Sequence, residues 1–258
     1  MTSTTERTPS LSRDGAERFT AALSAAELGG LLRFSDEMLS GQSGVRVFDR
    51  AEVGLVLGSD GSIGRCAGAI LGAAARPVRA ILFDKTADNN WAVPWHQDRT
   101  IAVRARREVP DFGPWSVKAG VVHVEPPFEI IAGMITIRAH LDDCGEDNAP
   151  LLIAPGSHRV GRVTATRAAE VACELGQATC VAAAGDLWVY ATSIVHASER
   201  AQTPRRRRVL HVDYANRGLA GRVGMARQPA WSGRVMRGHR SGTTPSAPSG
   251  LRSCDATA

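Results

Sequence analysis

Three residues of this sequence have the types and the spacing needed to hold a metal ion. His96 and Asp98 lie two positions apart in the run WAVPWHQD, and alternate residues of a β-strand point to the same side of a sheet. An imidazole and a carboxylate can therefore approach one point, and His196, after the strand-like run Leu187–Ala191, is the candidate third ligand. Two histidines and one carboxylate on one face of an octahedron form the facial triad of non-haem iron(II) oxygenases, which leaves three positions open.

The H-x-D tripeptide is weak support by itself, because a histidine that caps a turn beside a solvated aspartate would look the same. The sequence after His196 is more informative, since Ser198 follows it by two positions and Arg207 by eleven. A guanidinium group binds a carboxylate through two parallel hydrogen bonds, and a hydroxyl group adds a third. This pair fits the distal carboxylate of 2-oxoglutarate, whose keto-acid end would chelate the iron.

Arg207 belongs to a run of four arginines, and a solvated basic stretch explains most of that run. In a strand, Arg205 and Arg207 face one way and Arg206 and Arg208 the other, so only one or two can point inward. Arg138 and His140, on one face of the strand-like run 135–141, either point into the interior as well or form a buried hydrogen-bonded pair.

The elements that must position these residues are predicted to be mainly β-strands with helical support. Residues 16–41 carry apolar side chains at helical spacing, and further short helices are expected at 126–134 and 166–175. Helices followed by many short strands at close spacing are typical of a β-sandwich or jelly-roll barrel. The strands are expected at 79–83, 91–96, 101–104, 135–141, 151–153, 178–182, 187–191 and 209–215.

The chain is long enough for one sizeable core. Residues 1–15 are polar and are predicted to be a flexible N-terminus, followed by a single domain at 16–237 with its β-barrel core at about 79–217. Residues 238–258 are rich in Ser, Gly, Thr and Pro, which predicts a flexible tail.

The runs WAVPWHQD, LDDCGEDNAPLLIAPGSHRVGRV and GDLWVYATSIVHAS, with RRVL after them, resemble the phytanoyl-CoA dioxygenase family over about residues 79 to 217. The resemblance implies a double-stranded β-helix of the cupin-like jelly-roll type. It also implies iron(II) and dioxygen, 2-oxoglutarate as a co-substrate converted to succinate and carbon dioxide, and ascorbate as a stimulant.

By the same resemblance, His96, Asp98 and His196 would be the metal ligands, and Arg207 with Ser198 would hold 2-oxoglutarate. Gln97 and Trp115 would contact the co-substrate or line its pocket. The sequence departs from the family after H-x-S, where Glu199, Arg200 and Ala201 replace the usual small polar residues, and this leaves the substrate open.

The composition of the chain limits the binding partners and substrates that it can have. The net charge is +5, and only two of the 31 basic residues are lysines, which indicates either nucleic-acid binding, the less favoured alternative, or an arginine-rich genome with an anionic small molecule as substrate. No run of about 18 uncharged apolar residues could span a membrane, and the N-terminus lacks the apolar part of a signal peptide. We expect a cytoplasmic monomer or homodimer.

Three functions remain at this stage. The first is an oxygenase that hydroxylates or otherwise oxidises an unactivated C–H bond of a small metabolite, and Asp98 argues against a halogenase because its carboxylate fills the position a halide would need. The second is a non-catalytic, cupin-like metal-binding protein. The third is an oxygenase that acts on nucleic acid or protein.

Overall fold

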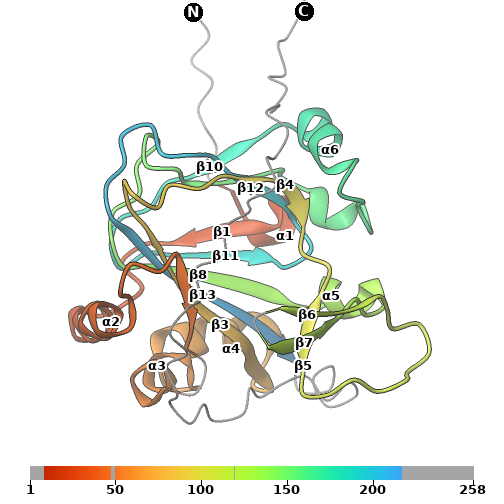
Figure 1. Cartoon of the computed structure of the whole chain (residues 1–258), viewed down its shortest axis with the longest axis horizontal. Helices are drawn as coiled ribbons and strands as arrows, with labels where there is room; N and C mark the ends of the chain where they lie inside the picture. The colour runs from red at the N-terminus through yellow and green to blue at the C-terminus, as the bar shows by residue number, and fades with distance from the viewer. Residues whose placement is uncertain (1–8, 48–49, 119, 217–258) are drawn as a thin grey trace, which may run out of the picture.

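Two antiparallel sheets face each other in the computed structural model, which describes residues 9–47, 50–118 and 120–216 (Figure 1). The major sheet has six strands in the order β1-β11-β8-β13-β3-β2. Their bounds are β1 Ala16–Phe19, β2 Gly44–Arg46, β3 Ala75–Lys85, β8 Ile135–His140, β11 Leu187–Ala191 and β13 Arg207–Asn216.

The minor sheet has the order β10-β9-β12-β4, and a third sheet beside the two has the order β5-β7-β6. Their bounds are β4 Val93–Gln97, β5 Ile101–Val103, β6 Trp115–Lys118, β7 Val121–Val124, β9 Leu151–Ile153, β10 Ala178–Cys180 and β12 Val195–Ser198. The predicted jelly-roll fold, mainly β with helical support, is confirmed. Within the described residues, the two main sheets are not joined by a continuous hydrogen-bonded ladder into a closed barrel.

Helices cover the outer face of each main sheet (Figure 1). The major sheet is covered by α2, α3 and α4, and the minor sheet by α6, whereas α1, α5 and the 3₁₀ helix η1 are short connections. Their bounds are α1 Leu11–Asp14, α2 Ala25–Met38, α3 Ala51–Leu57, α4 Ser62–Leu71, α5 Phe128–Ala132, η1 Ser157–Arg159 and α6 Ala168–Leu175. No helix in the described ranges is both long and apolar enough to cross a membrane.

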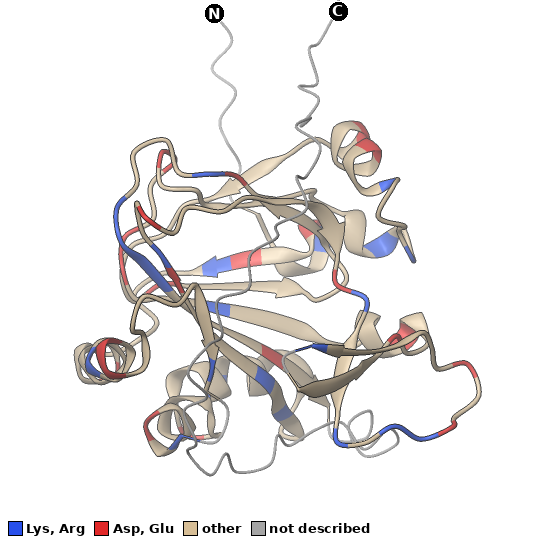
Figure 2. Ribbon diagram, viewed as in Figure 1, with Lys and Arg blue, Asp and Glu red and all other residues tan. Residues whose placement is uncertain are grey.

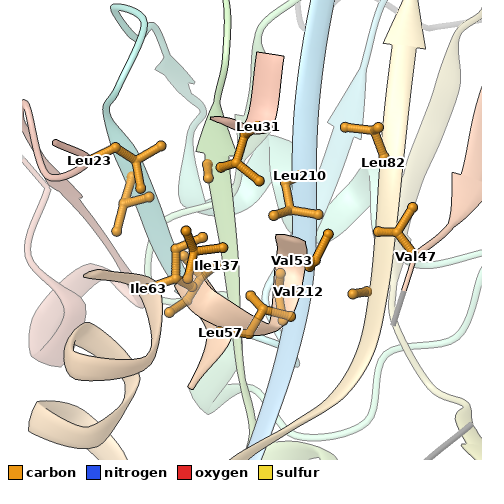
Figure 3. Close-up of a cluster of buried hydrophobic side chains, with 14 of the residues drawn as sticks. Leu23, Leu31, Val47, Val53, Leu57, Ile63, Leu82, Ile137, Leu210 and Val212 are labelled. Atoms are coloured by element: carbon orange, nitrogen blue, oxygen red, sulfur yellow. The ribbon is translucent and has the colours of Figure 1, made fainter. Parts of the chain in front are cut away.

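The two faces of the major sheet differ in polarity because side chains alternate along each strand. Ile137 of β8, Leu210 and Val212 of β13 and Leu82 of β3 pack against the helices in the main core cluster (Figure 3). The residues between them point toward the minor sheet, and many of these are charged. The helical layer therefore buries the apolar outer face of the major sheet, which leaves its inner face available for a polar site.

Two expectations at the N-terminus need correction. Ala16–Phe19 is not helical but forms the edge strand β1, which pairs with β11, because pairing with a sheet overrides the weak local helical pattern of four residues. Residues 9–15 are not loose either, since Leu11–Asp14 is a helix and Arg159 donates hydrogen bonds to the carbonyl groups of Ser12 and Arg13. The predicted tail at 238–258 lies outside the described residues, as do residues 1–8 and 217–237.

Glu27 links two of the covering helices. It completes a capping box with Ser24 at the start of α2, and its carboxylate accepts hydrogen bonds from the backbone and the hydroxyl group of Ser62 at the start of α4, at 2.9 and 2.7 Å. Burial raises the pKa of Glu27, but the hydrogen bonds from Ser62 and Ser24 outweigh this effect and lower it to about 2. The ionised form is therefore the one that stabilises the fold.

We predict that Glu27→Gln lowers the free energy of unfolding by roughly 1 kcal/mol at pH 7, since it weakens charge-assisted hydrogen bonds. A depressed folded-state pKa gives stability that is complete above the unfolded value near 4.5 and is lost as the pH falls toward 2. The difference between variant and wild type in urea unfolding should therefore shrink from pH 6 to pH 3. Glu37→Gln, an exposed residue of the same helix, is the control, and an equal loss from both variants would contradict the prediction.

Candidate metal centre and co-substrate site

The three predicted ligands meet at the edge of the minor sheet. Strands β4 and β12 are antiparallel neighbours, and their register places His196 directly opposite His96, with the two ring centroids 4.2 Å apart. Asp98 follows β4 by one residue. One potential ligand atom from each of the three residues lies within 4.8 Å of those of the other two, which is close enough for one ion to bind all three.

Both histidines are oriented by the backbone. Nδ1 of His96 lies 2.8 Å from the carbonyl oxygen of Pro94, and Nδ1 of His196 lies 3.0 Å from that of Ile194. A carbonyl oxygen can only accept, so Nδ1 of each ring is the donor and Nε2 keeps its lone pair for a metal ion. Burial lowers the pKa of His196 to about 4 despite the nearby Asp98, so this imidazole is neutral, as a ligand must be.

Asp98 is held by a charged network that the sequence analysis missed. The Arg79 guanidinium lies 3.6 Å from the Asp98 carboxylate and 2.6 Å from that of Asp213, and Asp213 also contacts His211 and accepts a hydrogen bond from Thr136. Burial alone would raise the pKa of Asp98, but the positive charge of Arg79 outweighs it and lowers the pKa. The carboxylate is therefore anionic and oriented before any metal ion binds. The only signal in the sequence was in β13, where His211 and Asp213 alternate with Leu210, Val212 and Tyr214.

The four consecutive arginines differ in their ion-pair partners. Arg205 pairs with Asp147, Arg206 with Asp36 and Asp84, and Arg208 with Asp36 and Asp142. Arg207 alone of the four has no carboxylate partner in the described structure, although its side chain points inward and the residue is only 4% exposed.

Arg207 has the properties of a carboxylate-binding residue. Its Nε and one terminal nitrogen are buried without a hydrogen-bond partner among the described residues. Burial and the nearby Arg138 lower the pKa of Arg207 to about 10, so the side chain remains charged at neutral pH. A buried, charged guanidinium without an anionic partner among the described residues is costly unless an anion binds it, and the residues present therefore fit a carboxylate co-substrate.

Ser198, Gln97 and Trp115 are placed differently from one another. Ser198 lies two residues after His196 on β12 and donates a hydrogen bond to the carbonyl oxygen of Ala149. The Gln97 amide bonds three backbone groups, namely the carbonyl oxygens of Gly161 and Ser193 and the amide of Val163.

Gln97 thus holds a loop against β4, on the side opposite His96. Trp115 packs in the apolar cluster of the third sheet with Ile101 and Val124, and the Arg106 guanidinium lies 5.7 Å from its ring centroid. The described structure gives neither side chain a place beside the three ligands. A contact of Gln97 or Trp115 with the co-substrate stays a prediction.

Comparison with known proteins shows the family to which this chain belongs. A sequence model described as Phytanoyl-CoA dioxygenase (PhyH) matches residues 64–209, whereas none of the curated proteins matches. The chain belongs to the phytanoyl-CoA dioxygenase family, as its sequence motifs predicted.

Solved structures with a similar fold have low sequence identity to this chain. The non-haem alpha-ketoglutarate-dependent epimerase SnoN from nogalamycin biosynthesis is 17% identical, with a TM-score of 0.59 over 80% of each chain. AviO1 from Streptomyces viridochromogenes Tue57 is 20% identical, with a TM-score of 0.55 over 80% of this chain and 91% of that one. EctD from S. alaskensis, solved with 2-oxoglutarate and 5-hydroxyectoine, is 16% identical, with a TM-score of 0.58 over 80% of this chain and 73% of that one.

We predict that His96→Ala, Asp98→Ala and His196→Ala each weaken the binding of manganese(II) or iron(II) by at least about 100-fold. Loss of one of three protein ligands should cost more than the roughly 10- to 100-fold loss seen when a supporting residue is removed. Anaerobic calorimetry measures this directly. Asp88→Ala, an exposed aspartate ten residues before Asp98, is the control, and metal affinity at the wild-type level in any of the three variants would remove that residue from the site.

Proposed function

We propose that this protein is an iron(II)- and 2-oxoglutarate-dependent oxygenase that hydroxylates, or otherwise oxidises, an unactivated C–H bond of a small metabolite. Bound iron with dioxygen supplies the oxidising chemistry, while 2-oxoglutarate is converted to succinate and carbon dioxide. The observation that carries the proposal is the buried Arg207 guanidinium, which has no carboxylate partner in the described structure and lies inside the same two-sheet interior that the metal-site residues face. A protein that only bound a metal ion would have no use for it.

Different residues of the chain would bind the metal ion and the co-substrate. His96, Asp98 and His196 would hold the metal ion and leave three positions open, two for the keto-acid end of 2-oxoglutarate and one for dioxygen. Arg207 would bind the distal carboxylate, with Ser198 as a further hydrogen-bonding group. Arg79 keeps the Asp98 carboxylate ionised and fixed in direction, so that the geometry of the site is set in advance.

A small-molecule substrate is favoured over nucleic acid by the charge distribution. In the view of Figure 2, the Lys and Arg residues of the described ranges are interspersed with Asp and Glu residues along the ribbon. Nucleic-acid sites are typically a clustered basic surface. The structures of SnoN and EctD, described as an epimerase from nogalamycin biosynthesis and as a complex with 5-hydroxyectoine, support small molecules as the substrate class, with hydroxylation one of several outcomes.

We predict that Arg207→Gln raises the KM for 2-oxoglutarate by about 30- to 1000-fold, since the lost charge-assisted contact is worth roughly 2–4 kcal/mol. Metal affinity should change little because Arg207 is not a ligand. Succinate formation at varied 2-oxoglutarate concentrations measures the effect, and Arg205→Gln, which breaks only an exposed ion pair with Asp147, is the control. A normal KM in the Arg207 variant would contradict the assigned role.

We also predict that the products contain oxygen from dioxygen, or have lost hydrogen, and contain no chlorine even in concentrated chloride. Asp98 fills the coordination position that a halide would need, so the unmodified protein has no place for chloride beside the co-substrate and dioxygen. Mass spectrometry of products formed under oxygen-18 gas in chloride buffer tests this. Label in succinate is expected, and a chlorinated product would overturn the assignment of Asp98.

A further inference from the structure

The inner face of the major sheet is arranged in layers by strand register. Asp213 is paired with Arg79 and Thr136 next to the metal site, and the last layer holds Lys85 paired with Arg207. The layers between them contain Arg138, paired with His211 and Trp188, and His140, paired with Val209. Arg138 and His140 therefore lie between the metal site and Arg207.

Unsatisfied polar atoms are concentrated on this inner face. Of the ten buried side-chain nitrogen and oxygen atoms without a partner among the described residues, seven belong to the five residues Arg138, His140, Tyr190, Arg207 and His211. Four of the five are at most 5% exposed, and Arg138 is 9% exposed. Because buried polar groups in proteins are almost always hydrogen-bonded, such a concentration marks the place of a ligand.

The same region carries positive charge that nearby side chains do not balance. In the described structure neither Arg138 nor Arg207 forms an ion pair with a carboxylate, and burial raises the pKa of the nearby Cys144 and Cys180 thiols, which therefore stay neutral. The ammonium group of Lys85 adds a third charge, although it is hydrogen-bonded to the carbonyl oxygens of Trp91 and Glu199. Several buried cations at close range are unfavourable without an anion.

We propose that Arg138 joins Arg207 in binding one anionic group, the distal carboxylate of the 2-oxo dicarboxylic acid, with His140 as a further hydrogen-bonding group. A carboxylate offers about four lone-pair sites, enough for two guanidinium groups. A ligand that extends from the metal site to Arg207 must pass the layer of Arg138. This inference rests on the proposed function and adds to it a residue that determines co-substrate specificity.

The test compares two 2-oxo acids of equal chain length, 2-oxoglutarate and 2-oxopentanoate, which differ in the distal carboxylate. Binding is measured by anaerobic calorimetry on the full chain loaded with manganese(II), so turnover is not needed. Arg138→Gln should weaken 2-oxoglutarate binding by about 10- to 100-fold and leave 2-oxopentanoate binding nearly unchanged. Arg138→Lys, which keeps the charge but loses the planar fork, should fall between the wild type and Arg138→Gln.

Two further variants separate the inference from the proposed function. Arg205→Gln should bind both acids as the wild type does, whereas Arg207→Gln should weaken 2-oxoglutarate binding. If Arg207→Gln weakens it and neither Arg138 variant does, the role of Arg138 is wrong and the proposed function stands. If no variant affects it, the co-substrate site itself is wrong.

An equal loss of affinity for both 2-oxo acids in the Arg138 variants would indicate that Arg138 has a packing role, and would overturn the inference. Thermal unfolding without ligand provides a second readout, which does not depend on metal loading. Because Arg138→Gln removes one of two neighbouring buried charges, its unfolding midpoint should not fall below that of Arg138→Lys. A clearly lower midpoint would also contradict the inference.

Discussion

The antiparallel pairing of β4 with β12 is the constraint on which the site depends. It places His96 opposite His196 although a hundred residues separate them in the sequence. The Nδ1 atom of each ring faces the carbonyl oxygen of the residue two positions earlier in the chain. Asp98 is brought to the same point by its position two residues after His96. A shift of one residue in this pairing would turn one histidine to the other side of the sheet.

The major sheet contributes charged groups that surround the ligands held by the minor sheet. Its apolar side chains pack against α2, α3 and α4 in the main core cluster, so its inner face can hold charged groups without loss of the core. These groups fall into two parts. Arg79 and Asp213 balance each other beside Asp98, whereas Arg138 and Arg207, further inside, have no acidic partner in the described structure. The pair of Arg79 and Asp213 orients a metal ligand. The pair of Arg138 and Arg207 would be stabilised by a bound anionic ligand.

Much of this could be predicted from local sequence pattern. The alternation of residues along a strand was enough to place His96 with Asp98 and to show that only one or two of the four arginines could point inward. The same alternation puts Gln97 on the side opposite His96. The prediction that Gln97 contacts the co-substrate rested on the family resemblance and did not take this alternation into account. Strand β1 was missed because four residues carry too little periodicity to outweigh a neighbouring helical pattern. Arg79 and Asp213 were missed because their contact depends on the cross-strand register of β3 and β13, which no local pattern specifies.

The central claim is that one metal ion, held by His96, Asp98 and His196, is chelated by 2-oxoglutarate whose far end lies at Arg207. Anaerobic titration of the protein with iron(II) and 2-oxoglutarate, followed by visible absorption, tests it most directly. We expect a weak metal-to-ligand charge-transfer band that needs both components, is absent in His196→Ala, and requires much more 2-oxoglutarate in Arg207→Gln. Iron binding of normal strength with no such band at saturating 2-oxoglutarate would contradict the account.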